Sequence, residues 1–187
     1  MKTHLNPVEK PNGIIMKLAY WLTKRKFGKV LTPLRVIYTR LPLVFLLFAS
    51  KIEKLTKKVS ISQELAYMIK TYVAQLNVCL FCVDIGKTIA VNNSLNLDKL
   101  FQLPTFRQNK LFNEAEKAAL AFAEEITKTK SVSDETFSHL KNFYNERQIC
   151  EITWLVASEH YYNIMNLTFN IHSDNLCQVK PRKKMLV

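Results

Sequence analysis

The sequence has little glycine, proline or cysteine for its length. Only three glycines and six prolines occur in 187 residues, which leaves little material for the turns that an all-β protein needs. Four cysteines are too few for a disulfide-rich secreted scaffold. These shortages favour a helical protein, and the frequent Leu, Ala, Lys and Glu residues favour it too.

Long hydrophobic runs are also missing. The longest is LPLVFLLFA at 41–49, which is far shorter than the roughly 20 residues that span a bilayer. The N-terminus is polar and does not fit a secretory signal. We therefore expect a cytoplasmic protein without a transmembrane segment.

Acidic residues are scarce at both ends of the chain. Residues 1–60 carry a formal charge of +11, residues 61–179 carry −3, and residues 180–187 carry +4. We expect a basic N-terminal helical extension at 1–60 that packs on a core domain at 61–179, followed by a basic tail at 180–187. Such basic segments either bind an anionic membrane surface or a nucleic acid, or they are solvated charge that keeps a protein soluble. The second role is the more common one.

Apolar residues recur at helical spacing through most of the chain, and no segment alternates as a strand does. Thr32 is expected as an N-cap, and Pro42 should bend or divide the helix that follows. A polar connection is expected at 95–111. The expected helices lie within 14–30, 32–56, 60–77, 78–94, 112–128, 133–145 and 145–169.

Capping residues mark several of the helix ends. Asn113 is followed three residues later by Glu116, which predicts a capping box. Ser133 repeats the signal for the next helix, and Gly28 can end the first one. Asn77 suits two roles, because it can end one helix or cap the next.

The stretch NVCLFCVDIGK at 77–87 places Cys79 and Cys82 three residues apart. On a helix they share one face, about 5–6 Å apart at Cβ, and can form a disulfide or stand as neighbouring thiols. If Asn77 caps the helix, Cys79 lies in its first turn, where free N–H groups stabilise a thiolate. Inert packing stays an alternative. A metal site is another, although the other two cysteines offer no second close pair.

The segment VAQLNVCLFCVDIGK resembles the core of the carboxymuconolactone decarboxylase and alkylhydroperoxidase D (AhpD-like) family, in which a helix precedes Asn-x-Cys-x-x-Cys. The blocks KRKFGKVLTPLRVIYTRLP and ERQICEITWLVASEHYYNIMNLTFNIHSDNLC resemble a branch of that family with extensions at both ends. The resemblance covers roughly residues 15–178. It implies an all-α, AhpD-like helical bundle that assembles into a homo-oligomer, either a trimer or a multiple of trimers.

The resemblance also implies a chemistry. In peroxidase members of the family, the second motif cysteine attacks a hydroperoxide as a thiolate, and the first resolves the sulfenic acid. That makes Cys82 peroxidatic and Cys79 resolving, whereas the dipole argument prefers Cys79 as the thiolate. We give the resemblance more weight, because the dipole contributes only roughly 0.3–1 kcal/mol. The implied partners are a hydroperoxide or disulfide substrate and an unidentified thiol reductant, with no cofactor or metal.

Two positions depart from the peroxidase pattern. The peroxidases carry a histidine four residues after the second cysteine, where this chain has Gly86, and a glutamate twelve residues before the first, where it has Tyr67. Glu64, one helical turn before Tyr67, is our predicted general base. His160 could replace the base, but a hydrogen-bonded structural role is more common, and Glu159 beside it is expected to pair with a basic residue. Without a relay, the alternative function is a catalytically silent helical oligomer that acts as a binding or scaffold protein.

Overall fold

A computed structural model describes residues 2–177, so the predicted basic tail at 180–187 lies outside the described residues. Within the described part the chain is helical and contains no β-strand, which confirms the predicted all-α class. No helix in this part of the chain combines the length and the apolar character needed to cross a membrane.

The N-terminal helices are short and partly π-helical. The helical segment η1 ends at Tyr38, and a new helix begins with Pro42 as its first residue, so the expected break at this proline is confirmed. From Pro42 onward, α2, η2 and α3 follow one another without a gap as one continuous helix. The segments are α1 (Ile14–Phe27), η1 (Leu34–Tyr38), α2 (Pro42–Val44), η2 (Phe45–Ala49) and α3 (Ser50–Thr56).

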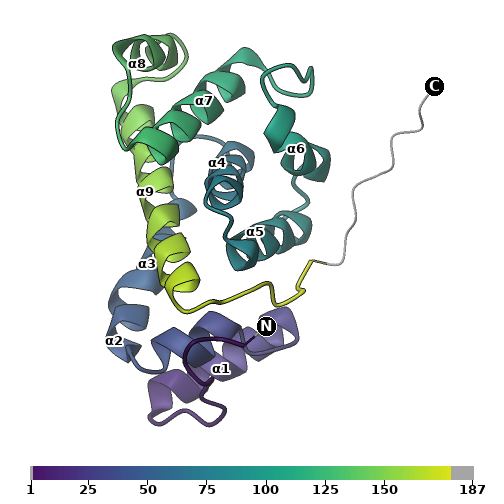
Figure 1. Cartoon of the computed structure of the whole chain (residues 1–187), viewed down its shortest axis with the longest axis vertical. Coiled ribbons are helices and arrows are strands. Elements are labelled where there is room, and N and C mark those ends of the chain that lie inside the picture. The colour runs from purple at the N-terminus through teal and green to yellow at the C-terminus, as the bar shows by residue number, and fades with distance from the viewer. Residues whose placement is uncertain (1, 178–187) are drawn as a thin grey trace, which may run out of the picture.

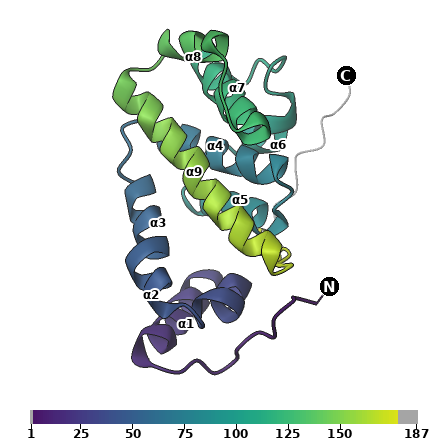
Figure 2. The same ribbon diagram turned by 60° about the vertical axis from the view of Figure 1, so that its left-hand side comes forward.

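The remaining helices form a bundle around α4, which packs against α5, α7 and α9 (Figures 1 and 2). Leu120 of α7 and Leu155 of α9 are fully buried with Ile69 of α4 in its main apolar core. The elements are α4 (Gln63–Leu76), α5 (Leu80–Asn92), α6 (Leu97–Gln102), η3 (Leu103–Thr105), α7 (Glu114–Thr129), α8 (Asp134–Lys141) and α9 (Glu146–Thr168).

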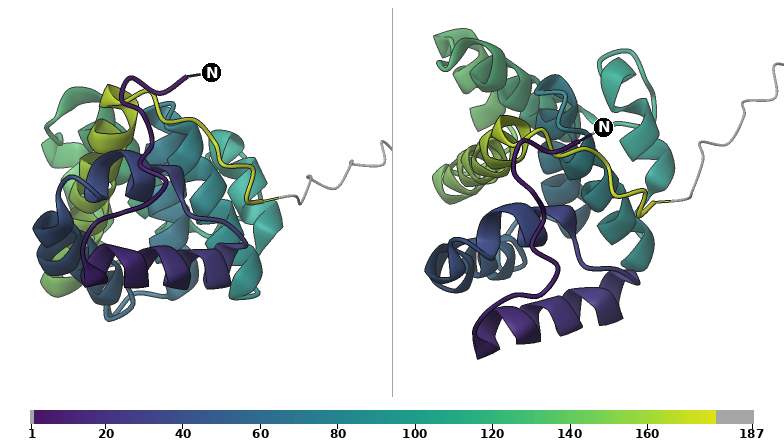
Figure 3. Two further views of the ribbon diagram at one scale, coloured as in Figure 1. Left: turned by 90° about the horizontal axis from the view of Figure 1, so that it is seen from below. Right: turned by 60° about the horizontal axis from the view of Figure 1, so that its bottom comes forward.

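A second apolar cluster joins the N-terminal helices to the start of α5. Met16 and Leu34 from the N-terminal part are buried in it together with Phe81, Cys79 and Cys82. In Figures 1 and 3 the N-terminal helices lie against the end of the bundle where α5 and the C-terminal end of α9 meet. The cysteine region is therefore enclosed by the N-terminal helices and by residues at the C-terminal end of α9.

The segment after α9 is fastened by two carboxylates. Asp84 of α5 accepts hydrogen bonds from the backbone N–H groups of Leu176, at 2.9 Å, and Cys177, at 2.8 Å. Asp174 accepts from the backbone N–H of Thr32 at 2.8 Å and from its hydroxyl at 2.5 Å. Thr32 therefore does not act as the expected N-cap, because its hydroxyl donates to a residue distant in sequence. The segment ties α5 to the N-terminal helices.

Most predicted helix ends are confirmed. The capping box at Asn113 and Glu116 is formed by hydrogen bonds of 2.8 and 3.0 Å, and Gly28 ends α1 in a left-handed conformation with φ of 75°. The expected polar connection at 95–111 was wrong in part, since it contains α6 and η3. The side chain of Asn96 caps α6, a signal that the sequence analysis missed.

The helix at 14–27 lies within the predicted range 14–30, and only part of its apolar surface is buried. Ile14 is 84% exposed, whereas Met16, Ala19 and Tyr20 are buried. The Tyr20 hydroxyl donates to the carbonyl oxygen of Val8 at 2.6 Å. That hydrogen bond to the N-terminal arm fixes which side of α1 faces inward.

Candidate functional site

The two cysteines follow a tight turn between α4 and α5. Asn77 is the C-cap residue of α4, Val78 has a left-handed φ of 56°, and Cys79 is the N-cap residue of α5. The sequence left two roles open for Asn77, and in the structure it ends α4 and does not cap α5. A left-handed φ at a β-branched residue costs about 1–3 kcal/mol, so the surrounding packing must hold this turn in place.

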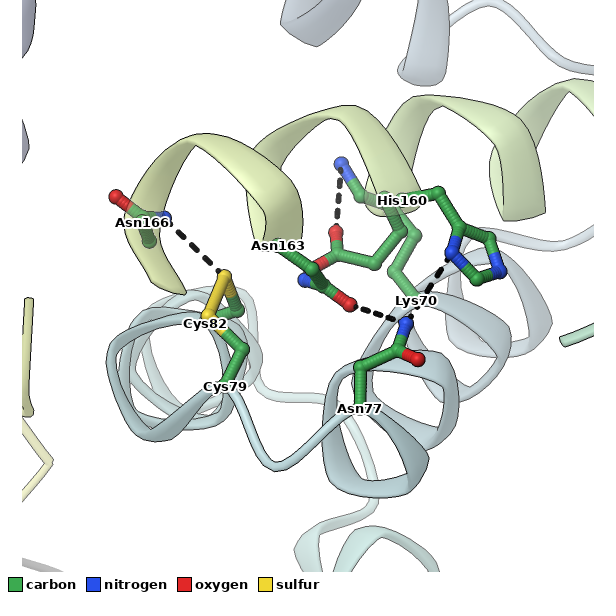
Figure 4. Close-up of a disulfide and its surroundings, with 8 residues drawn as sticks. Lys70, Asn77, Cys79, Cys82, His160, Asn163 and Asn166 are labelled. Atoms are coloured by element: carbon green, nitrogen blue, oxygen red, sulfur yellow. Dashed lines mark hydrogen bonds and ion pairs between the residues drawn. A yellow bond between two sulfur atoms is a disulfide. The ribbon is translucent and has the colours of Figure 1, made fainter. Parts of the chain in front are cut away.

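Cys79 and Cys82 are joined by a disulfide, and their Cα atoms are 5.3 Å apart (Figure 4). Cys79 is completely buried, whereas Cys82 is 5% exposed and lines a cavity. Cys79 is the N-cap residue of α5 and Cys82 lies in its first turn, so both residues are near the positive end of the helix dipole. The dipole therefore does not favour one cysteine over the other in the structure, whereas the cavity does distinguish them.

One amide from α9 contacts the sulfur that faces the cavity. Asn166 Nδ2 donates to Cys82 Sγ at 3.3 Å (Figure 4). A donor aimed at sulfur stabilises the thiolate relative to the thiol, because the charged form is the better acceptor. No sequence pattern pointed to Asn166, because it lies on a helix that is distant from the cysteines along the chain.

Further hydrogen bonds connect the start of α5 to α9. Asn77 Nδ2 donates to Asn163 Oδ1 at 2.8 Å and lies 3.3 Å from His160 Nδ1 (Figure 4). His160 Nε2 lies 3.3 Å from the hydroxyl of Thr127. Both ring nitrogens thus have partners, and burial together with Lys130 lowers the pKa of His160. His160 therefore has hydrogen-bond partners on both sides of its ring, which agrees with the structural role that was expected.

The next link in this network is Glu159. Asn163 Nδ2 donates to Glu159 Oε1 at 2.8 Å, and Lys70 Nζ lies 3.8 Å from Glu159 Oε2, which confirms the expected basic partner. Lys70 also lies 3.9 Å from Glu53 Oε2, on α3. Burial raises the pKa of Glu159 to about 7, although the Lys70 ammonium and the Asn163 amide act in the opposite direction. A carboxyl group with that pKa can both take up and release a proton near neutral pH.

The structure does not bring Glu64 to the cysteines. Its Oε1 lies 3.6 Å from Lys99 Nζ, which also pairs with Glu116 at 2.7 Å, and Glu64 is absent from the cavity wall. Tyr67, one turn further on, does line the cavity, and its hydroxyl donates to Glu53 Oε1 at 3.2 Å. The carboxylates on the cavity wall are Glu53 and Glu159, and the sequence analysis named neither as a base.

The cavity beside Cys82 has a volume of about 180 Å³. The N-terminal helices form one wall and α5 forms another, while the polar groups Thr71, Lys70 and Glu159 come from α4 and α9. In the part of the chain described by the structure, no cluster of acidic, histidine or cysteine side chains could hold a metal ion. The apolar and aromatic lining residues are Leu31, Pro33, Leu34, Tyr38, Phe45, Phe81, Ile85, Ile89 and Tyr162.

Gly86 also lines this cavity, and it packs closely on α4. A Cβ atom at Gly86 would lie 2.7 Å from Thr71 Oγ1. Thr71 therefore occupies part of the space in which the peroxidase pattern has a histidine. Close packing of α5 on α4 therefore accounts for a glycine at this position.

Replacing Gly86 with alanine is expected to destabilise the protein by about 1–3 kcal/mol, because the new methyl group overpacks a closed contact. Urea unfolding would measure the change. The double variant Gly86→Ala/Thr71→Ala should recover much of the loss, since it removes the atom that clashes. A gain of about 1 kcal/mol in the single variant, as at an open helical position, would contradict the close packing.

Comparisons with known proteins extend over most of the chain. No family model matches it. The chain is 28% identical over 173 residues to the uncharacterized protein YnjA of Escherichia coli strain K12, a match that covers 91% of this chain and 94% of YnjA. The uncharacterized protein YdfG of Bacillus subtilis strain 168 is 28% identical over 117 residues, covering 62% of this chain and 80% of YdfG.

Solved structures are similar over the same extent. The apo debrominase Bmp8 superposes with a TM-score of 0.79 at 22% identity, covering 93% of this chain and 94% of Bmp8. A Cys-to-Ala variant of Bmp8 was crystallised with 2,3,4-tribromopyrrole. The alkylhydroperoxidase AhpD core of an uncharacterized peroxidase-related protein from Ralstonia eutropha JMP134 has a TM-score of 0.72 at 19% identity, covering 86% of this chain and 85% of that one.

Proposed function

We propose that Cys79 and Cys82 form a redox-active dithiol that reduces hydroperoxides. The AhpD-like helical fold of the chain and the disulfide between these two cysteines support this proposal. The observation that carries the proposal is the position of the pair. The two sulfur atoms are bonded to each other at the start of a helix, and one of them lines a cavity. A disulfide that must open and close needs one sulfur within reach of its reaction partners, and Cys82 meets that need.

The reaction is a two-electron exchange. The Cys82 thiolate attacks the terminal oxygen of the hydroperoxide, the O–O bond breaks, and the products are an alcohol and a Cys82 sulfenic acid. The Cys79 thiol then attacks that sulfur, which releases water and forms the disulfide. An external dithiol reduces the disulfide and is itself oxidised. In this proposal Cys82 is peroxidatic and Cys79 is resolving.

Glu159 is the proposed base in place of Glu64. Glu159 and Cys82 line the same cavity, and water within that cavity is the proposed route for the proton. The Glu159 carboxylate accepts the proton of the Cys82 thiol and gives it to the alkoxide that leaves. Asn166 supports the thiolate through its hydrogen bond to Sγ. Proton and electron counts both balance, and the carboxylate is regenerated.

Reaction of the reduced protein with one equivalent of hydroperoxide tests the proposal. We expect two of its four cysteines to become resistant to iodoacetamide, and mass spectrometry should identify them as Cys79 and Cys82. Alkylation of Cys82 should show a pKa below the ordinary value of about 8.5. The variant Cys150→Ser/Cys177→Ser serves as the control and should behave like the wild type.

The same experiment addresses the alternative of a catalytically silent oligomer. A silent helical protein would keep all its thiols alkylatable after peroxide treatment, and its cysteines would titrate near about 8.5. Both results together would rule out the peroxidase proposal and favour a binding or scaffold role.

A second candidate function is reductive debromination of a small aromatic molecule. The likeness to Bmp8 over 93% of this chain and the apolar lining of the cavity support it. In that reaction two thiols and an aryl bromide give the disulfide, the arene, bromide and a proton. Release of bromide from a brominated pyrrole by the reduced protein, measured by ion chromatography, would separate this function from peroxide reduction.

A further inference from the structure

We propose that the cavity beside Cys82 is a binding chamber for an uncharged organic molecule built on one ring, with its single polar group held by Thr71 and Asn166. The inference rests on the proposed function, because it assigns a substrate class to the same two cysteines. Three properties of the cavity carry it: its volume, its unpaired polar atoms and its charge.

The volume sets the size of the molecule. A cavity of about 150 Å³ with an apolar lining is known to accept benzene, and pockets for drug-sized ligands occupy about 300–1,000 Å³. The cavity in this protein has about 180 Å³. One ring with a short substituent fits that volume, whereas most of the chain of a fatty-acid hydroperoxide would have to lie outside it. Hydrogen peroxide is small enough to enter the cavity, but it makes no apolar contacts with the lining side chains.

Two buried polar atoms mark where the polar group binds. Thr71 is 1% exposed and Asn166 is 3% exposed. Thr71 Oγ1 and Asn166 Oδ1 have no hydrogen-bond partner among the described residues, although both side chains line the cavity. Buried polar groups nearly always have a partner, so these two atoms are suited to a ligand. Asn166 also contacts Cys82 Sγ, which places the polar group beside the sulfur.

The charges around the cavity exclude an anion. Lys70 is the basic residue on its wall, and it lies within 4 Å of both Glu53 and Glu159. Its charge is therefore already balanced, and the two carboxylates repel a negative ligand. A neutral molecule avoids that repulsion.

The N-terminal helices shape the opposite side of the chamber. Leu34 and Tyr38 of η1 and Phe45 of η2 line it together with Phe81 and Ile89 of α5. Flat apolar side chains on both sides suit a planar ring. Selectivity for the ring therefore depends on residues that lie far from the cysteines in sequence.

Binding can be tested separately from chemistry. The alcohol 2-phenyl-2-propanol has one ring and one hydroxyl and cannot oxidise a thiol. Calorimetry on the full-length wild-type protein should detect this alcohol, with at least about 10-fold weaker binding for 2-methyl-2-propanol, which lacks the ring, and none for benzoate. Cumene hydroperoxide should correspondingly show a KM at least about 10-fold below that of hydrogen peroxide.

Three variants locate the binding. Thr71→Val keeps the shape but removes the hydroxyl, and it should weaken binding of the alcohol by about 5- to 10-fold, while Thr71→Ser should restore it. Ile89→Trp should abolish binding by filling the chamber. The matched control is Ile164→Trp, since Ile164 is 63% exposed on α9 and does not line the cavity.

The outcomes separate this inference from the proposed function. Absence of alcohol binding, or equal effects of Ile89→Trp and Ile164→Trp, would overturn the chamber even if peroxide were consumed. Binding that follows the expected pattern would support the chamber even if no peroxide turnover occurred, in which case the proposed peroxidase chemistry would be the part that is wrong.

Discussion

Replacement of Cys82 by serine is expected to abolish hydroperoxide turnover, with kcat/KM falling at least roughly 1,000-fold, as for loss of a nucleophile elsewhere. The reason is that a thiolate forms near neutral pH and a serine hydroxyl does not. Cys82 is also the cysteine that lines the cavity and accepts the hydrogen bond from Asn166. Peroxide consumption with a dithiol reductant, followed by absorbance, measures the loss.

Cys79→Ser is the matched control for this prediction. It removes the other sulfur of the same disulfide but leaves the nucleophile in place. Without added reductant, we expect the reduced variant to consume one equivalent of peroxide and then stop, with a Cys82 sulfenic acid that dimedone can trap. If Cys82→Ser gave the single turnover and Cys79→Ser were inactive, the roles would be reversed, as the dipole argument from the sequence first suggested.

The sequence was sufficient for those features of the fold that local chemistry determines. The cysteine spacing predicted that the two side chains would lie close enough for a disulfide, and the capping box at Asn113 predicted where α7 starts. The turn at Asn77 was less certain, because the same residue type can end one helix or begin another. That difference of two residues in the start of α5 places Cys79 at the N-cap position and Cys82 in the first turn.

The composition of the candidate site could not be predicted in the same way. Glu64 was selected because it is close to Tyr67 along the chain. In the structure, however, Glu64 pairs with Lys99 of α6 and does not line the cavity. Glu159 and Asn166 reach the site only because α9 packs across α4 and α5. Contacts between distant helices depend on how whole faces pack, and helical periodicity in a single sequence does not specify that pairing.

Different residues occupy the two positions at which the peroxidase pattern has its relay. Gly86 and Tyr67 take the positions of the peroxidase histidine and glutamate, yet both residues line the cavity. Gly86 leaves room for Thr71, and Tyr67 donates to Glu53. Polar groups that line the cavity with Cys82 come from α4 and α9, and Glu159 on α9 is the proton-transfer group that we propose in place of the peroxidase pair.

Glu159→Gln is the second prediction with a large expected effect. Glutamine keeps the size of the side chain and its acceptor for Asn163, but it cannot take up a proton. We expect peroxide turnover at pH 7 to fall by about 10- to 100-fold, because the Cys82 thiol must then ionise without a base. In the wild type, activity should rise with pH through about 7, the pKa of Glu159. In the variant the rise should move toward about 8.5.

The same pKa has a consequence for stability. Burial raises the pKa of Glu159 in the folded protein from 4.5 to about 7. The charge of Glu53 also raises this pKa, whereas the charge of Lys70 lowers it. Between these two values the folded state holds a proton that the unfolded state has released, so stability should fall as pH rises from about 4.5 to about 7. Glu159→Gln should remove the part of this pH-dependent loss of stability that comes from Glu159. Urea unfolding at several pH values would measure the change in the free energy of unfolding.

Glu64→Gln is the matched control, because Glu64 is the same residue type on the neighbouring helix α4 and is paired with Lys99 away from the cavity. It should leave both the peroxide rate and its pH profile unchanged. If Glu64→Gln lowered the rate and Glu159→Gln did not, the base would be the one that the sequence suggested, and the buried carboxyl would have only a structural role. If the two variants behaved alike, with the wild-type pH profile in each, the Cys82 thiolate would owe its formation to Asn166 and the helix dipole, and no carboxylate would be needed.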